Sequence, residues 1–364
     1  MKTQTYTVNF GPQHPSTHGV LRVVLELDGE TCVGSKTHVG YLHRGIEKLM
    51  EDRTYPQVIP YTDRLDYLAG ISNNLAYVQT VEKLMKIEVP ERAEYIRVIL
   101  AELMRIASHM VGIGIYIMDL GAVSAVFYPF IEREKILDLM CHITGARMTF
   151  NYMRIGGVAQ DLHPDFIPAL DKFIADFPRF IEDYHKLVDD NEIFKARTKN
   201  IGVVCAEKAM DYGLTGPNLR ASGVKHDTRV INPYSIYDRF DFEIPVGETG
   251  DCYDRYVVRM REVEESFKII KQAYKDLPEG PVMAKVPKLI KPPQGDVYHQ
   301  TENPKGVLGC YVVSDGSPKP YRVHFRRPSF NNISIFDELF IGHKVADVVA
   351  ILASFDFVLG EVDA

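Results

Sequence analysis

A long apolar segment with helical spacing, which begins at Pro90, constrains the fold of this 364-residue chain more than any other part of its sequence. Apolar residues recur there in steps of three and four, as on the buried face of a helix: Ile96, Ile99, Leu100, Leu103, Ile106, Ala107, Met110 and Ile113. Proline suits the first turn of a helix, because the amide hydrogen that it lacks would have no partner there. The pattern therefore predicts a long helix in the core of a helical bundle.

The most apolar stretch, Met110 to Ile131, raises the question of a membrane span, for which about 20 apolar residues are needed. Its centre carries Asp119, and Gly112 and Gly114 allow neighbouring segments to come close. These features favour a tightly packed interior segment. We therefore expect a soluble chain that associates with a membrane only through its partners.

Strands are expected in the sequence both before and after the helices of the bundle. Residues 6–10 and 20–27 alternate as strands, Asp28-Gly29 is a typical hairpin turn, and residues 31–38 would return as the partner strand. The remaining elements predicted are helices over 130–144, 163–190, 255–277 and 345–355, an irregular region with short strands over 200–250, a Pro/Lys linker over 285–295 and a second hairpin region over 306–327.

The predicted fold class is α+β, with a small N-terminal antiparallel sheet, a dominant helical bundle and a C-terminal mixed region. We expect residues 1–75 to form an N-terminal α+β region and residues 76–200 the bundle. Residues 201–364 would be packed as one unit with that bundle.

Composition and motifs argue against several functions. A formal net charge of −7 disfavours a general nucleic-acid binder, which needs a basic surface. The five cysteines form no CxxC pair, so a thiolate metal site or redox pair with that spacing is absent. The start, MKTQTYTVNF, has no apolar core of a signal peptide, so we expect mature protein on the cytoplasmic side. There is no GxGxxG, Walker A or GxSxG motif, and thus no recognisable nucleotide site.

The segment GPQHPSTHG, residues 11–19, is the first candidate site, because Pro and Gly fix a loop that presents two histidines and two hydroxyls. One alternative is a zinc site that uses His14, His18, His38 and His43, although Pro15 disfavours helical geometry at His14. The other alternative is a purely structural loop.

Two further candidates carry charge. The segment YTDRLDY, residues 61–67, combines three charges and two phenols; taken alone it favours a polar helix start with Asp63 as the N-cap. Asp119 is a lone carboxylate in the most apolar stretch. A buried carboxylate needs a partner or a proton, and histidine is a natural partner. The alternative for Asp119 is a helix-end cap that is exposed at the edge of the bundle.

Eight blocks of sequence, in order from the N-terminal loop to the C-terminal tail, resemble one known family. They are GPQHPSTHGVLR, GYLHRGIEKLMEDRT, YTDRLDYLAG, RIASHMVGIGIYIMDLGA, NYMRIGGVAQDL, GLTGPNLRASGVKHD, GDCYDRYVVRMRE and AILASFDFVLGEVD. The chain resembles the D subunit of NADH:quinone oxidoreductase, the respiratory complex I, which is the counterpart of the mitochondrial forty-nine-kilodalton subunit.

The same stretches resemble, more distantly, the large subunit of [NiFe] hydrogenases, whose fold the resemblance implies for this chain. That relative holds nickel with two CxxC pairs. Here Asp66 and Ala69 stand in place of the first pair, and Val358 and Glu361 in place of the second. The resemblance therefore implies a cavity without metal, and within complex I that cavity is the head of the quinone channel.

The resemblance also implies roles for individual residues. His18 and Tyr67 would bind the quinone headgroup, and Asp119 would hold His18. Arg44 and Arg64 match arginines near the pocket and the neighbouring iron–sulfur cluster, which a partner protein carries. The family's tail commonly has a proline where this chain has Phe357.

The implied protein is a peripheral subunit of a respiratory-chain enzyme on the cytoplasmic side of the bacterial plasma membrane, in which electron transport from NADH to ubiquinone or menaquinone drives proton translocation. Its expected partners are complex I subunits B, C, H and I. The alternatives are a hydrogenase-related metalloenzyme, a complex fed by ferredoxin, and a scaffold whose pocket is vestigial.

Overall fold

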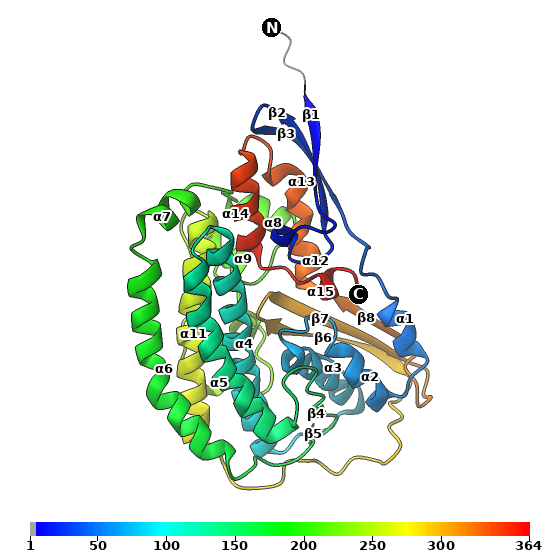
Figure 1. Cartoon of the computed structure of the whole chain (residues 1–364). Coiled ribbons are helices and arrows are strands. Elements are labelled where there is room, and N and C mark those ends of the chain that lie inside the picture. The colour runs from blue at the N-terminus through cyan, green and yellow to red at the C-terminus, as the bar shows by residue number, and fades with distance from the viewer. Residues whose placement is uncertain (1–4) are drawn as a thin grey trace.

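The computed structural model describes residues 5–364 and combines a bundle of long helices with two separate three-stranded sheets (Figure 1). The expectation of an N-terminus without a leader concerns in part residues 1–4, which lie outside the described residues. The predicted α+β class is confirmed, with the small antiparallel sheet at the N-terminal end of the chain.

The bundle consists of α4 (Glu91–Asp119), α5 (Phe127–Thr144), α6 (Phe166–Val188) and α11 (Cys252–Lys275). Helix α4 begins directly after Pro90, as predicted, and lies between α5 and α11. It is long and apolar enough to cross a membrane by composition, yet 94% of its most apolar window is buried inside the protein. The expectation of a packed interior segment over residues 110–131 is therefore confirmed for residues 110–117, but it is wrong for residues 118–131, which are mostly exposed at and beyond the end of α4.

The N-terminal sheet pairs β1 (Tyr6–Phe10), β2 (Arg22–Asp28) and β3 (Thr31–His38) in antiparallel order. The turn between β2 and β3 contains Gly29, at a positive φ of 61°, which glycine adopts without strain. Helices α13 (Phe336–Leu339) and α14 (Val345–Phe355) come from the other end of the chain and lie beside this sheet. The amide of Cys32 in β3 donates to the carbonyl of His343 at 2.9 Å, which ties the two chain ends together.

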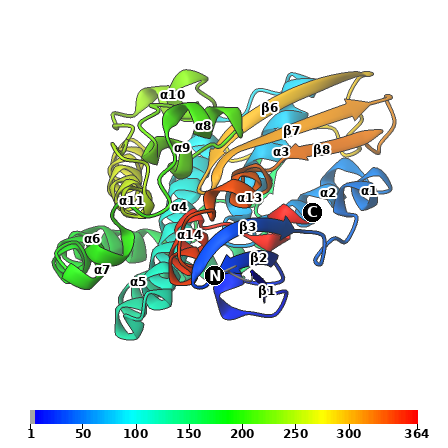
Figure 2. The ribbon, with the colours of Figure 1, turned by 90° about the horizontal axis from the view of Figure 1, so that it is seen from above.

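The second sheet pairs β6 (Gly295–Asn303), β7 (Gly306–Ser314) and β8 (Arg322–Arg326), with α3 (Gly70–Met85) packed along it (Figure 2). The predicted hairpin over residues 306–327 corresponds to β7 and β8, but β6 was not predicted. Its sequence, GDVYHQTEN, is mostly polar and follows the Pro/Lys linker. The strand forms because its amides and carbonyls pair with the apolar β7 along its whole length.

The prediction of short strands over residues 200–250 is wrong. This region forms the short helices α8 (Ala206–Asp211), α9 (Pro217–Ala221) and α10 (Thr228–Ile231). Buried charges attach it to the bundle in place of strand pairing: Arg220 lies 2.7 Å from Glu262 on α11, and Arg229 lies 3.1 Å from Glu102 on α4. Such pairs are stable in the interior because several hydrogen bonds satisfy each charged group.

One hydrophobic core contains buried residues from all three predicted regions, such as Leu25, Leu100 and Phe355. The remaining elements are η1 (Pro15–Thr17), α1 (Ile46–Glu51), α2 (Tyr55–Thr62), η2 (Val123–Val126), β4 (Met153–Arg154), β5 (Gly157–Val158), α7 (Glu192–Thr198), η3 (Tyr237–Arg239), α12 (Pro328–Asn332), η4 (Ile333–Ile335) and α15 (Leu359–Val362). The C-terminal tail from Asp356 to Ala364 is buried, and the loop with η1 packs against it at Gly19 and Leu359.

Candidate functional site

A mostly apolar cavity of about 480 Å³ lies between the N-terminal loop, the turn after α2, the second half of α4, α5 and the tail. Its lining residues are Pro15, His18, Tyr67, Leu68, Val111, Gly112, Ile115, Met118, Asp119, Phe130, Arg133, Asp356, Phe357 and Val358. A concave apolar site with a few convergent polar groups is typical of a small-molecule pocket. Three of the sequence-predicted residues, from segments far apart in the chain, meet in its wall.

His18 and Asp119 form the central polar contact of this cavity. The imidazole Nε2 lies 2.7 Å from the carboxylate Oδ2, and the two side chains are 16% and 10% exposed. Asp119 is the last residue of α4, as the alternative interpretation expected, but it is not an exposed residue at the bundle edge. The predicted contact between these two residues is therefore present.

The loop from residue 11 to 19 holds His18 by local hydrogen bonds. The Thr17 hydroxyl donates to the carbonyl of His14 at 2.7 Å, and the amide of Ser16 donates to His14 Nδ1 at 3.2 Å. His18 itself has a positive φ of 51° at the end of η1, a conformation that a residue adopts only when its surroundings fix it. The loop thus aims the imidazole at Asp119.

Tyr67 supplies the second polar group, with 37% of its side chain exposed. Burial and the neighbouring Asp66 carboxylate raise the pKa of Tyr67, so that the phenol keeps its proton and can donate it in a hydrogen bond. The predicted helix start at residues 61–67 is wrong: Asp63 is the C-cap of α2, and the chain turns there until α3 begins at Gly70. Asp63 Oδ2 instead accepts a hydrogen bond from the amide of Asn151 at 3.1 Å. This bond joins the turn to the segment before β4.

Arg44 and Arg64 do not line the cavity. Arg44 donates to the carbonyls of Arg64 and Gly360, and Arg64 donates to the carbonyl of Pro60. Both side chains are exposed on the outer side of the turn that carries Tyr67. Arg44 thereby joins this turn to the tail, whereas Arg64 bonds back to the last turn of α2.

The four histidines of the zinc alternative take separate partners. His18 bonds to Asp119, His14 packs on the ring of Phe10 at a centroid distance of 5.1 Å, and His43 Nδ1 lies 3.0 Å from the carbonyl of Asp363. His38 ends β3, opposite Arg22. The structure does not bring these imidazoles together.

Sequence reasoning missed three residues of the cavity: Arg133, Asp356 and Phe357. Phe357 stacks on His18 with ring centroids 6.0 Å apart and an angle of 26° between the planes. Its sequence signal was the aromatic residue in place of the family's proline. Asp356 has a positive φ of 52° and forms an ion pair with the buried Lys305. Nothing local in the sequence marks that pair, because Lys305 lies in the turn between β6 and β7.

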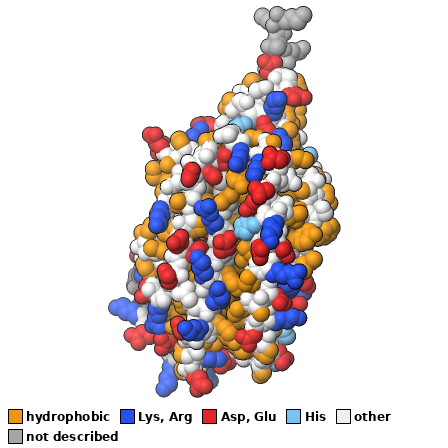
Figure 3. Space-filling model, turned by 90° about the vertical axis from the view of Figure 1, so that its left-hand side faces the viewer, with side chains coloured by type: hydrophobic (Ala, Val, Ile, Leu, Met, Phe, Trp, Pro, Cys, Tyr) orange, Lys and Arg blue, Asp and Glu red, His pale blue; other side chains and the backbone are white. Residues whose placement is uncertain are grey.

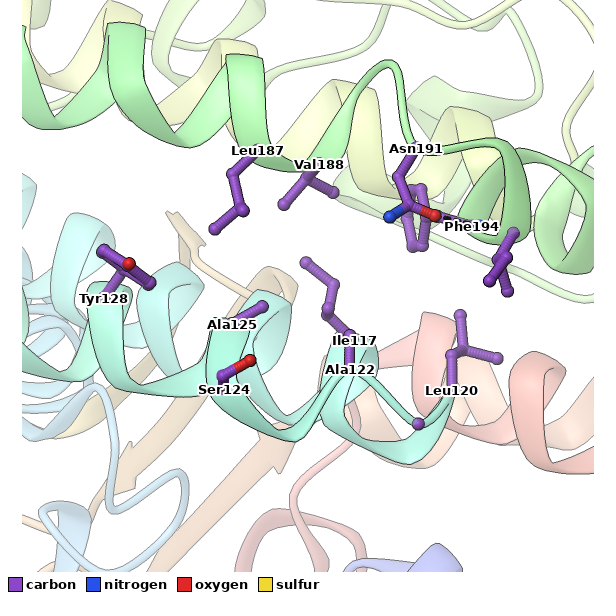
Figure 4. Close-up of a pocket in the computed structure, with 12 residues that line it drawn as sticks. Ile117, Leu120, Ala122, Ser124, Ala125, Tyr128, Leu187, Val188, Asn191 and Phe194 are labelled. Atoms are coloured by element: carbon purple, nitrogen blue, oxygen red, sulfur yellow. Dashed lines mark hydrogen bonds between the residues drawn. The ribbon is translucent and has the colours of Figure 1, made fainter.

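A second cavity, of about 380 Å³, lies on the other side of the end of α4 (Figure 4). In Figure 4 Leu187 and Val188 at the end of α6, Asn191 at the N-cap of α7 and Phe194 of α7 face Ile117, Ala122 and Ala125. The lining is apolar apart from Ser124, Tyr128 and Asn191. Because it has no group that could transfer a proton near neutral pH, the cavity with His18 is the better candidate for chemistry.

Comparison with known proteins agrees with the resemblance. The family described as respiratory-chain NADH dehydrogenase, 49 Kd subunit, matches residues 119–364. A protein of Desulforamulus reducens is 58% identical over 364 residues, with both chains covered completely. One of Clostridium beijerinckii is 59% identical over 363 residues, which cover 100% of this chain and 98% of that protein. One of Carboxydothermus hydrogenoformans is 58% identical over 363 residues, with complete coverage of both chains. All three relatives are named as the D subunit of NADH-quinone oxidoreductase.

Proposed function

Because the chain belongs to the family of the 49-kilodalton subunit of respiratory-chain NADH dehydrogenase, the D subunit of NADH-quinone oxidoreductases, we propose that its cavity beside His18 is the site where quinone is reduced. The observation that carries this proposal is the contact of 2.7 Å between His18 and Asp119 in the wall of a cavity that also holds Tyr67.

The chemistry of quinone suits these groups. Reduction to quinol takes two electrons and two protons, and negative charge develops on the carbonyl oxygens as the electrons arrive. The imidazole of His18 and the phenol of Tyr67 can each donate a hydrogen bond to one of these oxygens. The Asp119 carboxylate accepts a hydrogen bond from the imidazole and fixes the orientation of its ring.

The electrons have to come from a partner. An iron–sulfur cluster needs several thiolates that converge on it, whereas the five cysteines of this chain are all free and come from separate segments. We propose that a cluster in the B subunit supplies the electrons and that Arg44 and Arg64, exposed beside the Tyr67 turn, face it. Nickel would lack thiolate ligands at Asp66, Ala69, Val358 and Glu361, so this chain is proposed to bind no metal itself.

The proposed assembly is a complex I on the cytoplasmic side of the bacterial plasma membrane, in which quinone reduction drives proton translocation. The chain would associate with the B, C, H and I subunits and reach the membrane through them. The relatives' names give NADH as the electron source, and a complex fed by ferredoxin remains the second candidate.

Substitution of the headgroup residues tests this proposal. In the assembled complex, His18→Ala and Tyr67→Phe are each expected to lower quinone-linked turnover at least tenfold, while reduction of an artificial acceptor upstream of quinone continues. Tyr298→Phe, at an exposed tyrosine outside the cavity, is the matched control. Full quinone-linked turnover in both variants would favour a vestigial pocket, and nickel near one per chain would favour a hydrogenase.

A further inference from the structure

We propose that Asp66 and Glu361, two buried carboxyl groups behind the cavity, share one proton and deliver it to the quinone site during reduction. This inference rests on the proposed function and deepens it, since it adds a proton source to the residues that contact the headgroup. It assigns a positioning and proton-holding role, because neither side chain lines the cavity itself.

In each carboxyl group, one oxygen accepts a hydrogen bond and the other oxygen has no hydrogen-bond partner. Asp66 is 1% exposed, and its Oδ1 accepts from the amide of Leu68 at 3.0 Å. Glu361 is fully buried, and its Oε2 accepts from the amide of Ser329 at 3.0 Å. Within residues 5–364, Asp66 Oδ2 and Glu361 Oε1 are buried without any hydrogen-bond partner. An ionised oxygen in that position is costly, and a proton on it removes the cost.

The two groups lie on chain segments that pack together. A Cβ at Gly360, the residue before Glu361, would lie 2.8 Å from the carbonyl oxygen of Leu65 and 3.1 Å from the Tyr67 ring, the two neighbours of Asp66. Burial raises the pKa of Glu361 to about 7, and the Asp66 carboxylate raises it further. Burial also raises the pKa of Asp66 to about 6, which Lys305 opposes and Asp356 reinforces. Two buried carboxylates on such segments do not both ionise readily, so near neutral pH the pair keeps one proton.

The cations around the pair are engaged elsewhere. Lys305 forms its ion pair with Asp356, and Arg259 Nε lies 3.7 Å from the same carboxylate. Arg326, a further cation near Glu361, donates to the hydroxyl of Thr215 and to the carbonyls of Val307 and Gly213 at 2.8 to 3.0 Å. Arg327 donates to the main-chain carbonyl of Glu361 at 3.3 Å and not to its carboxylate. These cations lower the cost of an ionised pair without forming a hydrogen bond to either free oxygen. The pair can therefore lose its proton and regain it.

The pair adjoins the cavity at two points. Asp66 precedes Tyr67, and a Cβ at Gly360, the residue before Glu361, would lie 3.1 Å from the Tyr67 ring. On the other side, the ion pair of Lys305 leads to Asp356, which lines the cavity. A proton can thus pass from the carboxyl pair toward either the phenol or the Asp356 carboxylate.

The protons and electrons of this step balance. Quinone takes two electrons from the partner's cluster and two protons, one from the imidazolium of His18 and one from the phenol of Tyr67. The phenolate regains its proton from the Asp66–Glu361 pair, which changes from one bound proton to none. The pair and the His18 imidazole then each take up one proton from water before the next turnover, so that both protons of the quinol are replaced and no further reactant is needed.

The test uses the purified, assembled complex with a short-chain quinone analogue. For Glu361→Gln we expect a loss of turnover of about tenfold at pH 7 with an unchanged KM for quinone. In the unmodified complex, turnover should fall as pH rises through about 7, because the pair loses its proton there. In Glu361→Gln, turnover should no longer fall as pH rises through about 7. In Glu361→Asp, this pH dependence should be present again.

Infrared difference spectra between oxidised and reduced quinone give a readout that a structural role would not move. The carbonyl band of a protonated carboxylic acid is expected to change on reduction, to shift in heavy water and to be absent in Glu361→Gln and Asp66→Asn. Glu265→Gln is the matched control, since this buried carboxylate on α11 accepts from the amide of Glu243 at 2.9 Å on one oxygen and does not line the cavity. It should keep the rate and the band.

Two results would overturn the proton pair. One is an assembled Glu361→Gln complex with unchanged turnover, pH profile and band. If the amide variants do not assemble, the other is the absence of such a band from the unmodified complex. In both cases His18→Ala and Tyr67→Phe still decide the proposed function separately, because their loss of turnover does not depend on the pair.

Discussion

Asp119 and His18 are 101 residues apart in the sequence, and their contact depends on a single carboxylate charge. Asp119→Asn keeps the shape and can still hydrogen-bond, so the complex should assemble. Without the negative charge the hydrogen bond between the two side chains is weaker, and the imidazole is held less firmly toward the cavity. Quinone-linked turnover is therefore expected to fall. Unchanged turnover in a complete complex would reduce Asp119 to a helix-end residue.

His185 on α6 provides a residue-scale prediction about stability. Its Nδ1 lies 2.7 Å from Asp189 and its Nε2 2.9 Å from Glu264 on α11, and these hydrogen bonds raise its pKa to about 9. Because the pKa of the folded state lies above that of the unfolded state, the stabilisation is complete below about pH 6.5 and is lost as pH rises through about 9. With the site partly open to solvent, about 1–2 kcal/mol is at stake.

Thermal unfolding of the chain between pH 6 and pH 10 measures this effect. His185→Gln should unfold at a lower temperature than the unmodified chain at pH 6, and at nearly the same temperature at pH 10. A difference that stays constant across the range would mean that the imidazole contributes only by packing.

At the scale of elements, the sequence predicted the helices and strands that are determined by the pattern of their own side chains. Helix α4, strands β1 and β3 and helix α14 follow from their periodicity and turn residues. Strand β6 and the short helices over residues 200–250 did not follow, because pairing with β7 and buried ion pairs with α4 and α11 decide them. Such partners are far away in the sequence.

The same distinction between local pattern and tertiary contact applies to the residues of the candidate site. His18, Tyr67 and Asp119 stand out locally as a histidine in a fixed loop, a phenol in a charged segment and a carboxylate in an apolar one. Their convergence came from the family resemblance and not from spacing. The Lys305–Asp356 ion pair and the stacking of Phe357 on His18 were missed, since each joins a turn or loop to the tail by tertiary packing alone.

Gly112 sets how closely α4 approaches the tail. A Cβ at this position would lie 2.5 Å from the carboxylate carbon of Asp356. Gly112→Ala improves helix propensity by up to about 1 kcal/mol, but the clash with Asp356 should outweigh this and destabilise the protein by about 1–3 kcal/mol. Chemical denaturation measures the net cost.

A double-mutant cycle identifies the clashing partner. Asp356→Gly removes the carboxylate at a position whose positive φ of 52° suits glycine. In that background Gly112→Ala should cost little or even stabilise the protein, so that the two substitutions show a coupling of about 1 kcal/mol or more, as found for residues in contact. Additive effects would show that Gly112 has no steric role at this contact.

At the scale of the whole molecule, the surface does not look the same everywhere. The face of the bundle in Figure 3 mixes side chains of both charges with scattered hydrophobic ones, as expected for a chain with a net charge of −7. Around the junction of η2 and α5, by contrast, several large apolar side chains are more than half exposed: Val123, Phe127, Tyr128 and Ile131. Exposed apolar groups that cluster in this way mark interaction surfaces.

The cluster lies next to the cavity, since Phe130 and Arg133 on the same helix line it. A partner that covers the cluster would also close the cavity on this side, which suits the proposed membrane-embedded H subunit.

Phe127→Ser combined with Ile131→Ser is therefore expected to lower the yield of the co-purified complex by about tenfold, which corresponds to about 1.4 kcal/mol of association. The fold of the chain should be unchanged, because both residues are about 60% exposed. Met210→Ser, at a residue of similar exposure on α8, is the control and should leave assembly intact. Normal recovery of the complex with the double variant would place the interface with the membrane partner elsewhere on the chain.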